Sequence, residues 1–327
     1  MTEPSLQDWD KGDKSGLVSI GEHKLYVSIN GPDRRANEPV VIVMQGLGST
    51  IDEWVAVRRL TTPFVRFLTY DRSGLGKSES HARPLKAHTT VGIAHELDTL
   101  LCNLHLAPPY IVVGHSWGGV LARELLHLRP ADIVGMVFVD ANQETTFARH
   151  EEFPYACVQA IDTGIDAFEV TEERAKNVLL PGEFAAIERA QGDPRHQATT
   201  MAECEGFKLG VAVLAPKKQL EEHALGNHPV SVIHGRWTAR HFQNTLDAAI
   251  RLGNGTEQDR REYQHFVDDW EANSGARMRE ILKLSRDPSL CVYRESTKSG
   301  HNIQFMEPEI IVEEIKRVYD LVVQRGM

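Results

Sequence analysis

The sequence predicts an α/β fold in which helices flank a mostly parallel β-sheet and a helical cap is inserted late in the chain. Three observations support this prediction. Short apolar runs alternate with segments of helical periodicity. One of these runs leads directly into a Gly-x-Ser-x-Gly motif, and the alternation stops after Asp140 and resumes near residue 230. Strands that alternate with helices form parallel sheets, because each crossover returns the chain to the same end of the sheet.

The first half of the chain supplies most of the predicted sheet. Residues 1–16 are polar, and we expect them to be disordered. Short alternating runs at 17–20 and 24–29 predict a β-hairpin. The later apolar runs are continuous, as in strands buried on both faces. These strands are expected at 40–44, 67–70, 110–113 and 136–139, with helices at 88–104 and 117–128.

The helical cap is predicted over residues 142–227. This segment has mostly helical patterns, which prolines divide into short pieces. An insertion at this point would cover the carboxyl edge of the sheet, where ligands bind in open α/β folds. Residues 17–141 and 228–327 would form the core domain, with strands at 230–233 and 290–293 and helices at 258–286 and 308–323.

Composition and charge argue against several classes of function. The chain has 327 residues, a formal net charge of −10 and no apolar run long enough to cross a bilayer. An acidic surface repels nucleic acid and acidic membranes. The first residues lack the apolar core of a signal peptide, and the 4 cysteines lie far apart. We therefore expect a cytoplasmic protein with reduced thiols, a small-molecule partner, and no nucleic-acid or membrane partner.

The Gly-His-Ser-Trp-Gly-Gly segment at 114–119 predicts a nucleophilic serine. Such motifs occur by chance, but this one lies directly between a predicted strand and a predicted helix. A turn this tight forces Ser116 into the left-handed conformation and holds its hydroxyl above the sheet edge. The flanking glycines leave room where strand and helix cross. The N-terminus of the helix would stabilise negative charge that develops there.

A serine hydroxyl needs a neighbouring base, and His301 is the best candidate among 15 histidines. It follows Gly300 just after the last predicted strand, and the loops after parallel strands meet at one edge of the sheet. The other histidines, including His23 and His81, show no metal-ligand spacing. The sequence therefore predicts no metal and no cofactor.

Three carboxylates are candidates for the acid that orients His301. Asp140 ends the strand at 136–139, so its carboxylate could reach the histidine nitrogen remote from Ser116. Asp140 could instead cap a helix or bind the backbone. Glu144 and Asp247 are the alternatives. We favour Asp140 because its strand is expected beside the strand that leads to the serine.

Four segments together resemble the α/β-hydrolase superfamily, over most of residues 17–325. They are Gln-Gly-Leu-Gly at 45–48, Tyr-Asp-Arg-Ser-Gly-Leu-Gly-Lys-Ser at 70–78, the serine segment at 114–119 and Ser-Gly-His at 299–301. In that superfamily two backbone N–H groups form the oxyanion hole, which here implies Leu47 and Trp117. Many members have His-Gly where this chain has Gln45-Gly46, and a subset carries the acid on the strand before the cap, as Asp140 would be here.

The segment at 70–78 also ends like a phosphate-binding loop. That motif requires a glycine where this chain has Asp71, so the motif fails. We expect Asp71 and Arg72 to brace neighbouring loops. Several aromatic side chains could line an apolar pocket or simply fill the core: Trp54, Phe147, Phe153, Tyr155, Phe168 and Trp237.

The resemblance implies a serine hydrolase that cleaves an ester, lactone or thioester of a mostly apolar small molecule through an acyl-enzyme. Two alternatives stay open, because a fold does not fix its chemistry. The same residues could catalyse acyl transfer, cyclisation or a lyase step, or the protein could be a small-molecule receptor with a slow or vestigial triad. Dehalogenase and epoxide-hydrolase relatives carry aspartate where this chain has Ser116, which argues against those activities.

Overall fold

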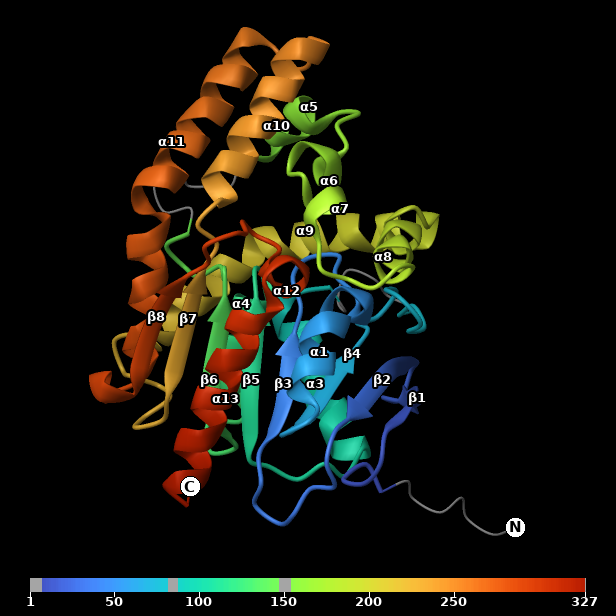
Figure 1. Cartoon of the computed structure of the whole chain (residues 1–327), viewed down its shortest axis with the longest axis vertical. Helices are drawn as coiled ribbons and strands as arrows, with labels where there is room; N and C mark the ends of the chain where they lie inside the picture. The colour runs from blue at the N-terminus through green and yellow to red at the C-terminus, as the bar shows by residue number, and fades with distance from the viewer. Residues whose placement is uncertain (1–7, 82–87, 147–153, 327) are drawn as a thin grey trace.

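The computed structural model describes residues 8–81, 88–146 and 154–326. Its centre is an eight-stranded sheet with the order β1-β2-β4-β3-β5-β6-β7-β8 (Figure 1). The strands are β1 Lys14–Ser19, β2 Lys24–Asn30, β3 Val40–Met44, β4 Arg66–Tyr70, β5 Tyr110–His115, β6 Ile133–Val139, β7 Val230–His234 and β8 Cys291–Glu295. Strands β1 and β2 are antiparallel, and all pairs from β4 to β8 are parallel. The predicted hairpin and mostly parallel sheet are confirmed.

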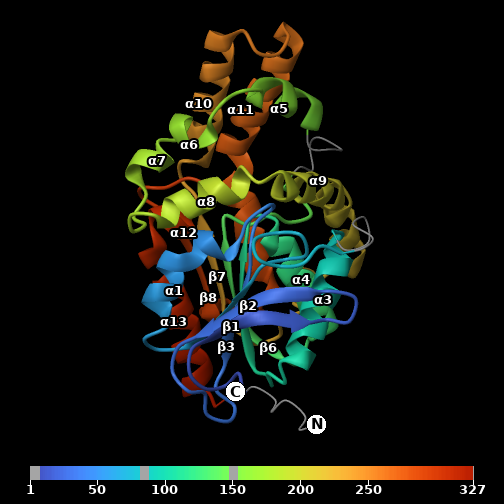
Figure 2. The same cartoon turned by 90° about the vertical axis from the view of Figure 1, so that its right-hand side faces the viewer.

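Helices cover both faces of this sheet and one of its edges (Figures 1 and 2). The helices that contact the sheet are α1 Val55–Thr61, α3 Thr90–Asn103, α4 Gly118–Leu128, α11 Glu257–Glu280 and α13 Pro308–Gln324. The others are α5 Tyr155–Asp162, α6 Ala167–Val170, α7 Glu173–Lys176, α8 Glu183–Gln191, α9 Pro194–Leu214, α10 Thr238–Leu252 and α12 Ile303–Met306. Short 3₁₀ turns are η1 Ile51–Trp54, η2 Ala215–Lys217, η3 Ile281–Leu284 and η4 Pro288–Leu290. No helix in the described ranges is long and apolar enough to cross a membrane.

Strand β3 illustrates why the central strands are apolar without interruption. All five of its residues are buried. Val40, Ile42 and Met44 pack into the core shared with α3 and α4. Val41 and Val43 point the other way, into the core shared with α1 and α13. Because alternate side chains enter different cores, a strand in the middle of the sheet has no polar face.

The expected disorder of the N-terminus was wrong for residues 8–16. Residues 9–12 form turns and bends, and β1 begins at Lys14. Trp9 is buried in the core on the α3 side of the sheet. The guanidinium of Arg66 donates to the carbonyls of Trp9 and Gly12, each at 2.7 Å. These contacts hold a polar segment in place, and residues 1–7 lie outside the described residues.

The helices above the carboxyl edge of the sheet come from two parts of the sequence. Helices α5 to α9 fall within the segment predicted as a cap. The long α10–α11 hairpin, which we assigned to the core domain, packs against α5 at the top of the molecule (Figures 1 and 2). Cys157 and Ile161 of α5 share a buried cluster with Leu246 of α10 and Tyr263 of α11. The upper helical layer, meaning α5–α9 together with the outer half of this hairpin, is therefore larger than predicted.

The crossing of α4 over β3 gives a test of the fold. A Cβ atom on Gly118 would lie 1.9 Å from the carbonyl oxygen of Met44, which is backbone and cannot move away. Gly118→Ala should lower the free energy of unfolding by roughly 3 kcal/mol, as overpacking of a rigid core does. Urea unfolding measures this. Gly192→Ala is the matched control, since its nearest contact would be 3.4 Å, and equal stability of the two variants would contradict the prediction.

Candidate active site

Ser116 occupies the turn between β5 and α4 with a φ of 54°, in the left-handed region expected from its motif. Two hydrogen bonds fix this strained turn. The Ser116 N–H donates to the Val139 carbonyl at 3.1 Å, and the Ser116 carbonyl accepts from the Asn142 N–H at 2.9 Å. Both partners belong to β6 and the residues just after it. The neighbouring strand therefore holds the serine at the upper edge of the sheet.

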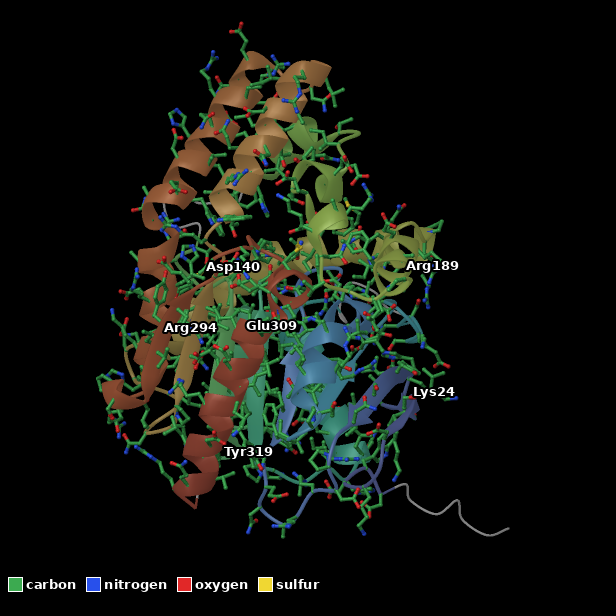
Figure 3. The ribbon with its side chains drawn as sticks, in the orientation of Figure 1. Lys24, Asp140, Arg189, Arg294, Glu309 and Tyr319 are labelled. Carbon is green, nitrogen blue, oxygen red and sulfur yellow. The ribbon has the colours of Figure 1, made fainter. Side chains whose placement is uncertain are left out.

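Asp140 lies at the carboxyl end of β6, beneath the upper helical layer (Figure 3). Its carboxylate is fully buried. Oδ2 lies 2.7 Å from Nδ1 of His301 and also accepts a hydrogen bond from the Thr238 hydroxyl at 2.9 Å. Oδ1 accepts from the Gly235 N–H at 2.8 Å. The carboxylate thus has fixed partners on both oxygens, with His301 as its ionisable partner.

The two alternative carboxylates lie elsewhere. Glu144 forms a two-pronged ion pair with Arg123, one arm of which measures 2.8 Å. Asp247 lies on α10 and accepts a hydrogen bond from the Gln243 side chain at 3.0 Å. Of the three candidates, the structure brings Asp140 to His301.

His301 belongs to a loop after β8, and hydrogen bonds to Glu307 and His115 hold this loop in place. The Glu307 carboxylate accepts hydrogen bonds from the backbone N–H groups of Thr297 and Lys298, each at 3.0 Å. The carbonyl of His301 accepts from Nε2 of His115 at 2.9 Å. Burial lowers the pKa of His115 to about 3, so this ring is neutral and donates one hydrogen bond. His115, the residue before the serine, thereby links the two loops.

The charges of Asp140 and His301 stabilise each other. Burial lowers the pKa of His301, but the hydrogen bond and charge of Asp140 outweigh it, and the pKa lies above its usual value. Burial likewise raises the pKa of Asp140, and the hydrogen bond from His301 reverses this, so that the pKa lies below its usual value. The arrangement favours an imidazolium next to a carboxylate.

Ser116 and His301 line the same cavity, which has a volume of about 210 Å³. Within the described part of the chain no hydrogen bond joins their side chains. The Ser116 hydroxyl donates instead to Oδ1 of Asn142 at 3.4 Å. We did not predict Asn142 as a site residue. The one feature of the sequence that could have indicated Asn142 is its position two residues after Asp140, where β6 has just ended.

Leu47 and Trp117 flank the serine with backbone N–H groups that have no hydrogen-bond acceptor among the described residues. Leu47 also lines the cavity. The side chain of Gln45, by contrast, is fully buried and donates to the Tyr70 carbonyl at 2.8 Å. Gln45 therefore supports the backbone behind the cavity and does not line it.

The loop that carries Leu47 is braced by a buried ion pair. Arg72 and Glu203 of α9 are 1% and 0% exposed at their side chains, and two of their atom pairs lie 2.6 and 2.8 Å apart. The same guanidinium donates to the carbonyls of Gln45 at 3.0 Å and Gly46 at 2.7 Å. Glu203 also accepts from the Gly48 N–H at 2.7 Å. Three backbone groups on either side of Leu47 are thus held by one charge pair.

This geometry agrees with the bracing role expected for Arg72, and Asp71 acts similarly. Its two carboxylate oxygens accept from the backbone N–H groups of Ile51 and Lys77, at 3.0 and 2.9 Å. Glu203 was not predicted. It is one acid among many in a helical segment, and no motif or spacing distinguishes it in the sequence.

The cavity wall is mixed in polarity. Its apolar part includes Leu47, Phe168 of α6 and Phe305, and its polar part includes Ser49 and Glu53. Burial raises the pKa of the Glu53 carboxyl to about 7, although the Ser49 hydroxyl donates to it at 2.7 Å.

The aromatic residues suggested by the sequence have different outcomes. Phe168 does line the cavity. Trp54 is fully buried, with its ring edge-on to His115, and Trp237 packs against the guanidinium of Arg240. Phe147, Phe153 and the side chain of Tyr155 lie outside the described residues.

Comparison with known proteins places this geometry in a family. A model of the alpha/beta hydrolase family matches residues 40–313. An AB hydrolase superfamily protein from Gibberella zeae is 29% identical over 324 residues, which cover 94% of this chain and 96% of that protein.

Solved structures share the fold at low sequence identity. The N-acyl homoserine lactone degrading enzyme Est816 has a TM-score of 0.61 at 14% identity, covering 92% of this chain and 99% of its own. The haloalkane dehalogenase DbeA from Bradyrhizobium elkani has a TM-score of 0.61 at 15% identity, covering 96% and 99%. Proteins with different activities thus share this fold, so the structures do not identify the family. The family model that matches residues 40–313 does. The chain belongs to the alpha/beta hydrolase family.

Proposed function

We propose that this protein is a serine hydrolase that cleaves an ester, lactone or thioester through an acyl-enzyme. The observation that carries the proposal is the 2.7 Å contact between Asp140 and His301 beside a serine in a strained turn. His301 and Ser116 share one cavity. A nucleophile, a base and a group that orients the base are what acyl transfer to serine requires.

In the first step Ser116 attacks the substrate carbonyl. Its hydroxyl turns from Asn142 toward Nε2 of His301, which takes the proton; such contacts are often long without substrate and tighten on binding. Asp140 keeps the other ring nitrogen protonated and stabilises the imidazolium. The N–H groups of Leu47 and Trp117 bind the oxyanion, each contributing about 3–4 kcal/mol to transition-state stabilisation. The tetrahedral intermediate then collapses, the bond to the leaving alcohol or thiol breaks, and His301 gives its proton to that group. Water activated by His301 next attacks the acyl-enzyme, which releases the acid and restores Ser116.

The nucleophile and the cavity narrow the substrate class. A serine nucleophile forms an acyl-enzyme, which requires a carbonyl group in the substrate. Related dehalogenases and epoxide hydrolases use aspartate at this place, so we assign carbonyl substrates. Leu47, Phe168 and Phe305 suit an apolar group, and Ser49 and Glu53 suit a hydroxyl or another hydrogen-bonding group. A cavity of about 210 Å³ is below the usual range for drug-sized ligands. The proposed substrate is therefore a small, mostly apolar molecule with one polar substituent.

Removing the nucleophile is the direct test. Ser116→Ala should lower kcat by roughly 10⁴–10⁶-fold, because neither the base nor the acid can act without it. A fluorophosphonate probe should add one covalent label to the wild type and none to this variant, as measured by intact-protein mass spectrometry. Ser49→Ala, which removes another serine of the same cavity, should still be labelled. Labelling of Ser116→Ala would refute the assignment of Ser116 as the nucleophile. If the wild type is labelled but hydrolyses no ester, the result would favour the alternative function of a small-molecule receptor.

The acid can be tested against a neighbouring candidate. Asp140→Asn should lower kcat by roughly 10²–10⁴-fold, because the amide cannot stabilise the imidazolium and permits the wrong tautomer. Asp247→Asn is the matched control, since Asp247 bonds only to Gln243 among the described residues, and its kcat should stay near that of the wild type. Steady-state kinetics on one activated ester compares the two. Equal losses, or no loss for Asp140→Asn, would remove Asp140 from the mechanism.

The Arg72–Glu203 pair should affect catalysis through the Leu47 loop. In Glu203→Gln the guanidinium keeps its carbonyl contacts but loses its counter-charge, which destabilises a buried pair strongly. We expect kcat to fall roughly 10–100-fold, equivalent to about 1.4–2.8 kcal/mol, with KM little changed, because the oxyanion exists only after attack.

Glu144→Gln controls for stability alone. It disrupts the partly buried pair with Arg123, away from the Leu47 loop, so it should lower the unfolding temperature while kcat stays near that of the wild type. Kinetics well below both unfolding temperatures compares the two variants. If both change kcat equally, Glu203 has no positioning role.

A further inference from the structure

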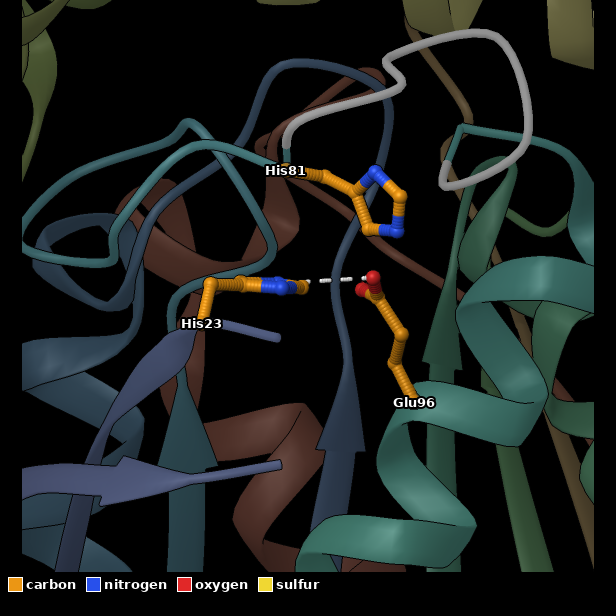
Figure 4. Close-up of side chains that lie close together, drawn as sticks. All are labelled: His23, His81 and Glu96. Atoms are coloured by element: carbon orange, nitrogen blue, oxygen red, sulfur yellow. Dashed lines mark ion pairs between the residues drawn. The ribbon is translucent and has the colours of Figure 1, made fainter. Parts of the chain in front are cut away.

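A second cluster of polar side chains lies away from Ser116, near the start of β2 (Figure 4). His23 follows the turn between β1 and β2, His81 lies in the loop after β4, and Glu96 belongs to α3. Each offers one ligand atom, and these atoms all lie within 4.8 Å of one another. Figure 4 shows the three side chains converging on one point. The sequence spacing predicted no metal set because the three ligands come from distant segments.

We propose that His23, His81 and Glu96 bind a divalent cation of the zinc type. Two imidazole nitrogens and a carboxylate are a common zinc ligand set. Ligand distances of about 2.0–2.2 Å place neighbouring ligands of a tetrahedral ion about 3.4 Å apart. Nε2 of His23 lies 3.4 Å from Oε1 of Glu96 and 2.5 Å from the Ser73 hydroxyl, so a cation would replace the Ser73 contact at this nitrogen. Small side-chain rotations would bring His81 to the same distance.

Glu22 lies outside the cluster of three, and its exposed side chain would have to turn inward to complete the coordination. Its Oε2 lies 3.3 Å from Nε2 of His81, again the edge length of such a tetrahedron. Glu22 directly precedes His23, so the hairpin turn would supply two of the four ligands. The Glu22 side chain is 71% exposed, which leaves the fourth position open to exchange with water.

The surroundings of Glu96 favour a bound cation. Its side chain is only 12% exposed, and Oε1 accepts no hydrogen bond from any described residue. Its other oxygen accepts from the Ser73 hydroxyl at 2.6 Å, which would orient the carboxylate as outer partners do in metal sites.

This site is separate from the candidate active site. It lines its own cavity of about 250 Å³, whose lining shares no residue with the cavity of Ser116. A cation there would join the β1–β2 turn, the loop after β4 and α3. Ser73, which touches both His23 and Glu96, is the neighbour of Arg72 in that loop. The expected role is therefore structural, fixing the segment from which Arg72 projects.

Binding can be measured with zinc and cobalt on the full chain. Protein freed of metal by chelator dialysis should bind one equivalent of Zn²⁺ by calorimetry, and one of Co²⁺ with the visible absorption of a tetrahedral site. At a hundredfold excess over Kd, Zn²⁺ should raise Tm by roughly 3–6 °C. Absence of stoichiometric binding of either ion would overturn the proposal.

Variants identify the ligands. His81→Ala and Glu96→Gln should each weaken Zn²⁺ binding at least about 100-fold, and Glu96→Gln keeps an acceptor for Ser73, so that loss of folding is avoided. His127→Ala, which removes an exposed histidine of α4, is the control and should bind as the wild type does. Far-UV circular dichroism verifies that each variant is folded. Equal affinity in His81→Ala, Glu96→Gln and His127→Ala would place the metal elsewhere and overturn the assignment.

Discussion

The buried ion pair between Arg72 and Glu203 is the contact on which the arrangement of the candidate site depends. Two charges with almost no access to water are tolerated only when both are fully paired. Arg72 satisfies its remaining donors on the carbonyls of Gln45 and Gly46, and Glu203 accepts from Gly48. Helix α9, the loop after β3 and the loop after β4 are therefore fixed relative to one another. Movement of the upper helical layer over the cavity would have to occur in helices other than α9.

The fold could be predicted from the sequence where an element depends on the pattern of its own residues. Continuous apolar runs located β3, β5, β6 and β7 to within three residues, because a strand between two cores has no polar face. The N-terminal segment could not be found this way, since Trp9 and Gly12 are held by the guanidinium of Arg66, far along the chain. The position of the α10–α11 hairpin was missed for a related reason. Its apolar face predicts burial, but not that α5 is the partner.

The residues of the candidate site likewise fall into those that a regular pattern could predict and those that it could not. Strand order in a parallel sheet is regular enough to predict that Asp140, at the end of β6, lies beside the serine turn and near His301. Glu203, Asn142 and Glu53 are single polar residues without a motif, and their roles depend on how helices and loops are placed over the sheet edge. The histidines of the proposed cation site are a further example, because their ligand set exists only after three separate segments come together.

The Glu53 carboxyl has a consequence for the fate of the product. With a pKa raised by burial to about 7, this group is half ionised near neutral pH. Hydrolysis of an ester at Ser116 would leave a second carboxylate in the same small cavity. A second negative charge at short range would raise the pKa of Glu53 further, so near neutral pH this group would take up a proton and could hold the product by a hydrogen bond. Only above neutral pH would Glu53 keep its charge and repel the acid, so product release from this cavity should become faster as the pH rises.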